Sequence, residues 1–412
     1  MALSAPATDT IDSSGFPLCF KTQQGSGQSP VLGLGDARDT FVVQARAMGG
    51  HQKEAVVTEG KAGSSWRMVS DEGPRLQGTD LAPFPLGFMS AGMQADLMNR
   101  IHQRARVQSI PITSIATELI TDYAFQGSFF KGNGRGYAYA PQLRVRVETA
   151  SSGAAIRDLV VESLAASPIF AAWRTPLVNT FALYANGRRR PLSTLAARLA
   201  PDAEDPFKAW RHSPRPLAGE DHSTRIIERI GQALVTEGPP SAGWQPGRVD
   251  IPIHGCSTID AASTRSLTWL NRADGTQFAL RTDEGTTQRA PSGLGYAFAG
   301  VAFCLMTQLL RYVEHHKMSI RALRLVQVSD CEMTSGRAQP HSLDTHIFVH
   351  GDEPDLVMER LVEMAANTCY LHAALHAELE PSLKLEVNGQ AFGPGSFDGT
   401  GFIATGDGNR TT

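Results

Sequence analysis

Five cysteines have the clearest capacity for chemistry in this 412-residue sequence, because a thiolate is a strong nucleophile that oxidants convert to a sulfenic acid or a disulfide. They are widely spaced and include no Cys-x-x-Cys pair, which is the pattern of neither a secreted disulfide framework nor a zinc site. Redox chemistry needs two thiols with Cα atoms about 4–7 Å apart. The elements around each cysteine therefore decide which of them can react. The cysteines are Cys19, Cys256, Cys304, Cys331 and Cys369.

Cys304 lies in the most apolar stretch of the chain, Pro291–Lys317. An Ala-Pro-Ser-Gly turn precedes this stretch, and Glu-His-His-Lys ends it, where positive charge suits a helix C-terminus. The apolar core, Gly293–Leu310, is marginal in length for a membrane span, and Gln308 and Arg311 argue against one. We therefore expect a fully buried central helix of a soluble domain. A thiol on such a helix is commonly inert packing, so other features must decide whether it reacts.

The rest of the chain divides by composition into five segments. We expect a flexible arm over 1–35, a first folded unit over 36–186, a linker or insertion rich in Pro, Gly and charge over 187–248, a second folded unit over 249–388, and a Gly-rich tail over 389–412. Strands are expected at 41–48, 54–60, 64–73, 112–127, 141–150, 177–185, 266–270, 276–285, 320–330, 344–351 and 383–387, with helices at 86–106, 154–166, 223–235 and 354–378.

Composition excludes several classes of partner. A formal net charge of -3 gives no reason to expect nucleic acid or an anionic membrane surface. The N-terminus lacks the basic and apolar regions of a secretory signal, so the cytoplasm is the expected location. His346 and His350 alternate along one strand, and His315 and His316 end a helix, but these residues do not have the spacing of a metal site. We expect neither a metal nor a bound cofactor.

The two folded units resemble each other in sequence beyond the order of their elements. Residues 70–98 align with 282–306, which pairs the Asp-Glu-Gly of 71–73 with that of 283–285 and Gly92 with Gly300. In this register Cys304 falls opposite Asp96. A second alignment, which needs a gap, places Cys369 opposite Ser167. The first unit therefore lacks both cysteines, and only the second has the residues for thiol chemistry.

At these residues the sequence resembles the OsmC/Ohr family of thiol-dependent hydroperoxide reductases. The resemblance rests on the Asp-Glu-Gly element, the Gly-Tyr-Ala-Phe-Ala-Gly-Val-Ala-Phe-Cys helix and the second helix that carries Cys369; it covers 279–387 well and 66–183 more weakly. It implies an α+β fold in which a curved antiparallel sheet wraps two long central helices. Family members are intertwined homodimers, so two repeats in one chain imply a fused pseudo-dimer.

The resemblance also implies roles for the matching positions. Cys304 would attack the hydroperoxide as the peroxidatic thiol, and Cys369 would resolve the sulfenic acid to a disulfide that an external dithiol reduces. The family's catalytic arginine has no certain match, and Arg67, Arg272 and Arg281 are the candidates. The second cysteine is followed by Tyr-Leu-His rather than the commoner proline.

Three other residues are candidates for proton transfer. Glu284 adjoins the loop before the central helix and could accept protons at the site, or it could be a solvated turn residue. His372 follows Cys369 by three residues, on the same helical face if the helix is unbroken. Asp96 is either a neutralised relic or a new acid or base, because a lone buried carboxylate is costly.

Three functions follow from these residues. The first is a thiol peroxidase acting on an apolar organic hydroperoxide. The second is a cysteine hydrolase, in which Cys304, activated by His372 or Asp96, attacks the activated carbonyl of a specialised small molecule. The third is a protein without catalytic activity that binds a small molecule in the apolar pocket between the helices.

Overall fold

The computed structural model describes most of the chain, and all statements below concern those residues. They are 9–23, 38–60, 63–129, 131–198, 202–219, 225–233, 235, 248–260, 263–284, 288–334 and 336–396. Much of the expected arm (1–8 and 24–35) and most of the expected tail (397–412) lie outside the described residues, as do several parts of the expected linker.

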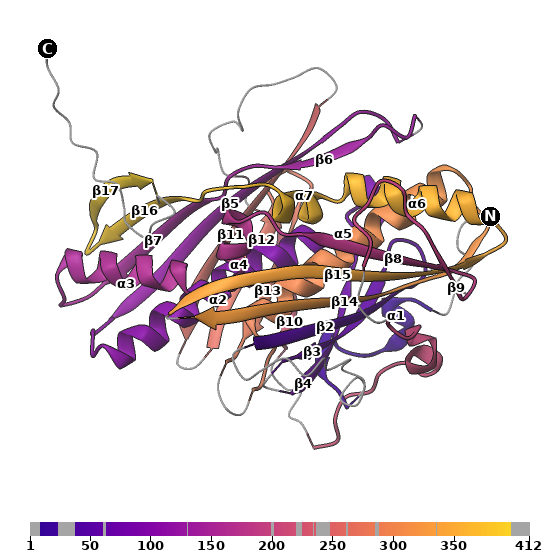
Figure 1. Ribbon diagram of the computed structural model, residues 1–412. Helices are drawn as coiled ribbons and strands as arrows, with labels where there is room; N and C mark the ends of the chain where they lie inside the picture. The colour runs from indigo at the N-terminus through magenta and orange to yellow at the C-terminus, as the bar shows by residue number, and fades with distance from the viewer. Residues whose placement is uncertain are drawn as a thin grey trace, which may run out of the picture.

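Two large β-sheets form the framework, and the expected α+β class is confirmed (Figure 1). The first sheet has the order β1 (Cys19–Lys21), β4 (Ser64–Ser70), β3 (Lys53–Glu59), β2 (Arg38–Ala47), β14 (Ile320–Thr334), β15 (Arg337–Gly351), β8 (Asn179–Ala185) and β9 (Arg188–Arg190). The second has the order β10 (Ile227–Gln232), β13 (Thr276–Thr282), β12 (Ser263–Leu270), β11 (Arg248–Asp260), β5 (Ser114–Gln126), β7 (Gln142–Glu148), β16 (Ser382–Val387) and β17 (Gln390–Ser396), with β6 (Arg135–Ala138) beside β5.

Each sheet combines strands from both halves of the chain. In the first sheet, β2 pairs with β14, and in the second, β11 pairs with β5. The long strands β14 and β15 run side by side across the front of the view in Figure 1. The sheets are not wholly antiparallel as expected, because β8 pairs with β15 in parallel and β16 pairs with β7 in parallel. Two helices precede β8 in the chain, and two precede β16. A helical crossover of this kind permits a strand to pair in parallel.

Two 23-residue helices, α2 (Pro85–Val107) and α5 (Gly293–His315), form the centre. They pack on each other; α2 also packs on β5, β11 and β12, and α5 on β2, β3 and β14. Their contact depends on glycine: a Cβ on Gly92 would lie 2.6 Å from the Gly293 oxygen, and one on Gly300 would lie 2.9 Å from the Pro85 oxygen. These pairings make the two helices antiparallel. The burial expected for α5 is confirmed: α5 is long and apolar enough for a membrane span, but its apolar window is fully enclosed by the fold.

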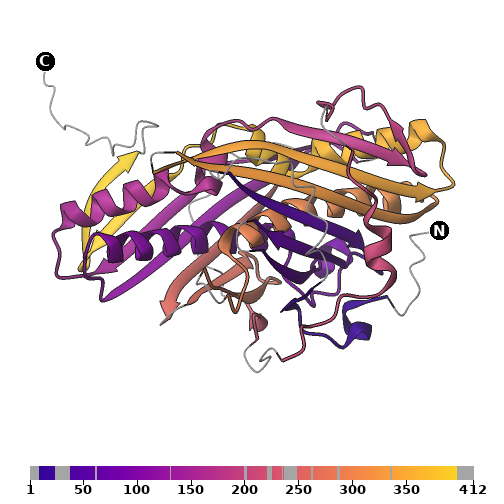
Figure 2. The ribbon, with the colours of Figure 1, turned by 60° about the horizontal axis from the view of Figure 1, so that its bottom comes forward.

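Shorter helices lie around this centre. They are α1 (Ile11–Ser14), α3 (Gly153–Ala165), α4 (Pro168–Arg174), α6 (Asp355–Thr368) and α7 (Tyr370–His376), with 3-10 turns η1 (Pro74–Leu76) and η2 (Pro206–Arg211). Figure 2 shows α3 beside α2, with which it is in contact. The single helix expected over 354–378 is wrong, because Cys369 adopts an extended backbone (ψ 114°) that ends α6 and begins α7.

The segments expected to be irregular also contribute to the sheets. The helix expected over 223–235 is instead the strand β10, which pairs with β13 and so satisfies an edge that would otherwise lack hydrogen bonds. In the expected arm, β1 pairs with β4 and buries Cys19 and Phe20. The expected tail begins with β17, which pairs with β16.

Candidate active site

Two cysteine side chains meet between α5 and the α6–α7 junction. Cys304 lies on the fourth turn of α5, and its thiol is close enough to Cys369 to influence the ionisation of that residue. Both cysteines are buried, with exposed fractions of 2% and 0%, and neither is in a disulfide. Burial first, and then the contact with Cys304, raise the pKa of Cys369 well above its usual value. Cys369 is therefore held as a protonated thiol against a second thiol that can react with it.

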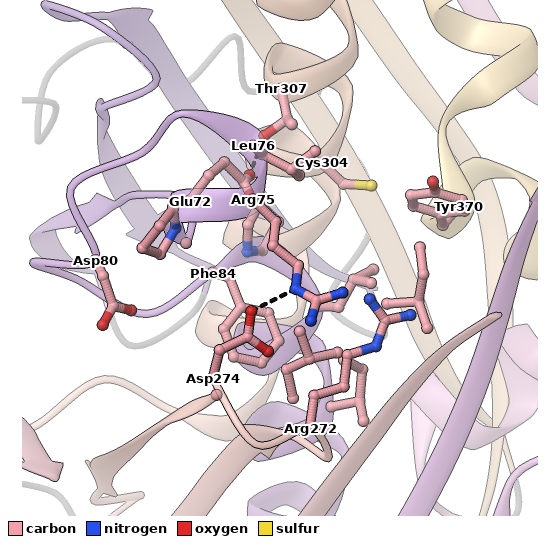
Figure 3. Close-up of a pocket in the computed structure, with 18 of the residues that line it drawn as sticks. Glu72, Arg75, Leu76, Asp80, Phe84, Arg272, Asp274, Cys304, Thr307 and Tyr370 are labelled. Atoms are coloured by element: carbon pink, nitrogen blue, oxygen red, sulfur yellow. Dashed lines mark hydrogen bonds and ion pairs between the residues drawn. The ribbon is translucent and has the colours of Figure 1, made fainter. Parts of the chain in front are cut away.

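A cavity of about 340 Å³ reaches Cys304 from the surface between two loops (Figure 3). Figure 3 shows the Cys304 sulfur pointing toward Tyr370, the residue after Cys369. Most of the wall is apolar, which suits a small hydrophobic ligand. The apolar wall includes Phe84, Leu86, Phe125, Ile251, Ile253 and Leu270.

One turn along α5 from Cys304, three buried polar side chains contact one another. Lys53 on β3 donates to Glu72 Oε1 at 3.0 Å and to Thr307 Oγ1 at 2.9 Å. The Thr307 hydroxyl lies 2.6 Å from Glu72 Oε1. Lys53 is fully buried, whereas Glu72 and Thr307 line the cavity together with Cys304. We call Cys304, Cys369, Glu72, Lys53 and Thr307 the thiol centre.

Asp71 holds the loop that carries Glu72 in place. The Asp71 carboxylate accepts hydrogen bonds from the backbone N–H groups of Thr79 and Leu81, both at 3.1 Å. The backbone N–H of Asp71 donates to the Pro83 carbonyl, which ties the end of β4 to the start of α2. Glu72 therefore has a defined position at the cavity although it lies in a loop.

Of the three candidate arginines, only one lines the cavity. Arg67 points to the face of its sheet away from the cavity, because residues alternate between faces along β4. On that face it forms a buried ion pair with Glu54 at 2.8 Å. Arg281 is not part of the cavity wall, but Arg272 is. Burial lowers the pKa of Arg272, and its guanidinium donates to the Asp250 carbonyl.

Two further arginines at the cavity were not predicted. Arg75 forms an ion pair with Asp274 across the mouth, and Arg311 lies 4.0 Å from the centre of the Phe129 ring. Burial raises the pKa of Tyr370 to about 12, and the nearby charge of Arg311 opposes this shift.

His372 contacts the second thiol of the pair. Its Nδ1 lies 3.1 Å from the Cys369 sulfur, although the intervening helix break was not expected. Burial lowers the pKa of His372 to about 4, so the ring is neutral near pH 7 and its unprotonated nitrogen can accept a hydrogen bond. The histidine is therefore placed to act on Cys369.

A second polar centre occupies the corresponding positions of the other half. The Ser167 hydroxyl donates to Asp96 Oδ2 at 2.5 Å, and Arg100 Nε donates to Asp96 Oδ1 at 2.8 Å. Asp96 and Ser167 have no exposed surface. Ser167 begins α4 as Cys369 begins α7. We call Asp96, Ser167, Arg100, Asn99 and Glu284 the carboxylate centre.

Glu284 lies in the carboxylate centre and not, as expected, beside Cys304. It is half-buried near Asn99 and the backbone N–H of Gly293. Burial first, and then the charge of Asp96, raise its pKa, while Arg100 opposes the shift. The reason is the antiparallel crossing of α2 and α5: each Asp-Glu-Gly loop precedes one central helix and therefore lies beside the far end of the other.

The same crossing separates Asp96 from Cys304. Gly293 faces the backbone of Asp96, so Asp96 lies level with the start of α5, about 16 Å along the axis from Cys304 at about 1.5 Å per residue. The expected activation of Cys304 by Asp96 is therefore wrong. Among the described residues, no group of three His, Cys, Asp or Glu side chains has the arrangement of a metal site.

Sequence reasoning missed Glu72, Lys53 and Thr307 at the thiol centre. The repeat contained a usable signal for one of them, since Glu72 is the counterpart of Glu284 in the Asp-Glu-Gly alignment. For Lys53 the repeat contained no such signal. Lys53 pairs with Ser70 in one sheet as Thr264 pairs with Thr282 in the other, so its counterpart is the uncharged Thr264.

Comparisons with known proteins give little further information. Searches against protein-family models and against curated proteins find no match. Among solved structures, the chain is similar to an OsmC-like hydroperoxide resistance protein from Jannaschia sp. CCS1, with 22% sequence identity and a TM-score of 0.24. The similarity covers 34% of this chain and 95% of that one.

Proposed function

We propose that the protein is a thiol-dependent peroxidase that reduces organic hydroperoxides at Cys304, with Cys369 as the resolving thiol. The observation that carries the proposal is the buried, reduced pair of Cys304 and Cys369, of which Cys304 lines a largely apolar cavity. An apolar hydroperoxide would bind in the cavity with its O–O bond at Cys304.

The reaction follows from the positions of the two sulfurs. The Cys304 thiolate attacks the terminal peroxide oxygen, the O–O bond breaks, and the alkoxide takes a proton and leaves as an alcohol. The Cys369 sulfur, beside His372 Nδ1, then attacks the Cys304 sulfenic acid and gives up its proton as the S–S bond forms. The S–O bond breaks, the hydroxide takes a proton to leave as water, and a disulfide remains. An external dithiol returns the disulfide to two thiols by exchange.

The proposal includes a family relation and a pseudo-dimer. The two sheets have the same order of elements, and each takes its strands from both halves of the chain. This is the arrangement expected if two OsmC-like repeats, 36–186 and 249–388, were intertwined within one chain. The first repeat then contributes Glu72 and Lys53 to the thiol centre of the second.

The proposal requires a dithiol reductant as partner and no bound cofactor. A reducing compartment is needed to keep the thiols active, and we propose the cytoplasm. Nothing in the site favours the cysteine hydrolase, because Asp96 lies in the other centre and His372 contacts Cys369.

The test is oxidation of the purified protein with a small excess of cumene hydroperoxide, followed by mass-spectrometric mapping of its thiols. We expect rapid formation of a Cys304–Cys369 disulfide, and a sulfenic acid trapped by dimedone at Cys304 in Cys369→Ser. Cys331→Ser is the matched control, because Cys331 is also buried (4% exposed) but lies on β14; it should react like the wild type. A Cys304 thiol that stays reduced while the cavity binds apolar ligands would contradict the peroxidase and support a binding protein.

A further inference from the structure

Glu72 lies at the thiol centre, but the reaction proposed above gives it no role. Its carboxylate is bound on one oxygen by both Lys53 and Thr307, at 3.0 and 2.6 Å. Thr307 follows Cys304 by three residues on α5, so the two side chains lie on one helical face. All three of Glu72, Thr307 and Cys304 line the same cavity. A water molecule in this cavity could connect the carboxylate with the thiol or with a bound peroxide.

The carboxylate centre shows how the same backbone positions hold a carboxylate. Asp96 occupies the position of Cys304 and forms an ion pair with Arg100. At Glu284, the counterpart of Glu72, burial first and then the charge of Asp96 raise the pKa. An anion at Cys304 should act on Glu72 in the same way, since the two glutamates occupy corresponding loops. A thiolate at Cys304 and a protonated Glu72 would then exist together.

We propose that Glu72 is the proton acceptor for the Cys304 thiol and the proton donor to the departing alkoxide, held in place by Lys53 and Thr307. This inference rests on the proposed peroxidase function. In the first step the thiol proton moves to Glu72, leaving a thiolate and a carboxylic acid. The thiolate attacks the terminal peroxide oxygen, and the O–O bond breaks. The alkoxide then takes the proton from Glu72, so that thiol and hydroperoxide become sulfenic acid and alcohol with the carboxylate regenerated.

The other charged and titratable groups near Glu72 come from several elements. Lys53 approaches from β3, Arg311 from α5 and Tyr370 from α7, while Arg272 lines the cavity from the β12–β13 turn. Lys53 and Arg311 favour a thiolate by their charge alone. A variant without the Glu72 carboxylate but with Lys53 therefore distinguishes proton transfer by Glu72 from stabilisation of the thiolate by positive charge. The variant loses the proton acceptor, while the net positive charge near Cys304 increases.

The experiment compares Glu72→Gln with the matched control Glu284→Gln, both in a Cys369→Ser background. The readouts are iodoacetamide labelling of Cys304 from pH 5 to 9 and the rate of dimedone-trapped sulfenic acid with cumene hydroperoxide. We expect both rates in Glu72→Gln to fall at least about tenfold at pH 7, the low end for loss of a general base, and labelling to recover at higher pH. Glu284→Gln should match the background protein.

Faster or unchanged labelling in Glu72→Gln would overturn the inference, because it would show that Glu72 only balances the charge of Lys53. If Glu72→Gln does not fold, Thr307→Val replaces it, since this change keeps the carboxylate and deletes its hydrogen bond with α5. A lower rate at pH 7 in Thr307→Val supports the inference, and an unchanged pH profile overturns it. A background protein whose Cys304 is not oxidised at all would instead refute the peroxidase function.

Discussion

The thiol centre and the carboxylate centre are built on the same positions and differ in what can happen there. In each, a side chain on a central helix lies near the residue that begins a short outer helix: Cys304 near Cys369, and Asp96 hydrogen-bonded to Ser167. Cys304 also lines a cavity, whereas Asp96 and Ser167 have no exposed surface. The fold therefore places two such side chains together at both positions, and Cys304 also lines a cavity.

The two centres also differ in where the positive charge lies. At the carboxylate centre, Arg100 sits four residues from Asp96 on α2 and pairs with it directly. At the thiol centre, the corresponding helix position is Gln308, and the cation is Lys53 on β3, which is paired with Glu72. Asp96 thus has a dedicated partner. Cys304 has no ion-pair partner of this kind among the described residues, and we infer that Glu72 of the Lys53–Glu72 pair takes its proton.

The largest expected effect comes from removing the anion of the carboxylate centre. Asp96→Ala should lower the free energy of unfolding by about 3 kcal/mol, because it leaves Arg100 and Ser167 without their buried partner. Cys304→Ala should cost about 1 kcal/mol. Urea unfolding of both variants measures the difference. The folded fraction of Asp96→Ala should retain hydroperoxide turnover, and equal stability losses in the two variants would show that the centres do not differ in this way.

A second expected effect concerns the start of α5. Glu59 accepts hydrogen bonds from the backbone N–H and hydroxyl of Ser292 at 2.8 and 3.0 Å, whereas α2 begins without a side-chain cap. Burial raises the pKa of Glu59 from 4.5 to about 7. The folded state therefore binds this proton more tightly than the unfolded state, and the resulting stability is lost as the pH rises from 4.5 through 7.

Over that range, the wild type should lose about 3 kcal/mol of stability relative to Glu59→Gln. The comparison must be made between variants because His346 and His372, whose pKa values burial lowers to about 4, change stability in the opposite direction. Urea unfolding at pH 4.5, 6 and 7.5 provides the measurement. A constant difference between the two proteins would show that Glu59 does not titrate in this range.

The smallest expected effect tests whether the two centres share one geometry. Asp96→Cys/Ser167→Cys places a thiol pair where oxygen atoms now lie 2.5 Å apart, and mild oxidation should close a second disulfide. The oxidised variant should be about 2 kcal/mol more stable than its reduced form. Ellman titration and peptide mapping would detect the bond. Its absence would mean that the two contacts differ in backbone geometry.

Much of the local structure could be predicted from the sequence. The apolar run around Cys304 predicted α5 nearly to its ends, and the alternating patterns located most strands of both sheets. The alignment that pairs Cys304 with Asp96 also follows from local sequence. The helix break at Cys369 and the edge strand β10 were missed, since neither has a strong local signal: β10 is decided by the free edge of β13, and Cys369 by its packing against α5.

Local sequence patterns therefore predict most of the elements, and the alignment of the two halves shows that the Cys304 and Cys369 positions carry thiols only in the second half. Only the tertiary structure decided which residues meet at those thiols. The Asp-Glu-Gly loops of the two halves are locally equivalent, so no local pattern assigns Glu72 rather than Glu284 to Cys304. The antiparallel crossing of α2 and α5 at their glycines, together with sheets that combine strands of both halves, brings each loop to the far end of the other half's helix. Long-range strand pairing and helix packing carry that information, because they depend on contacts between residues more than 200 positions apart, such as Lys53 and Thr307.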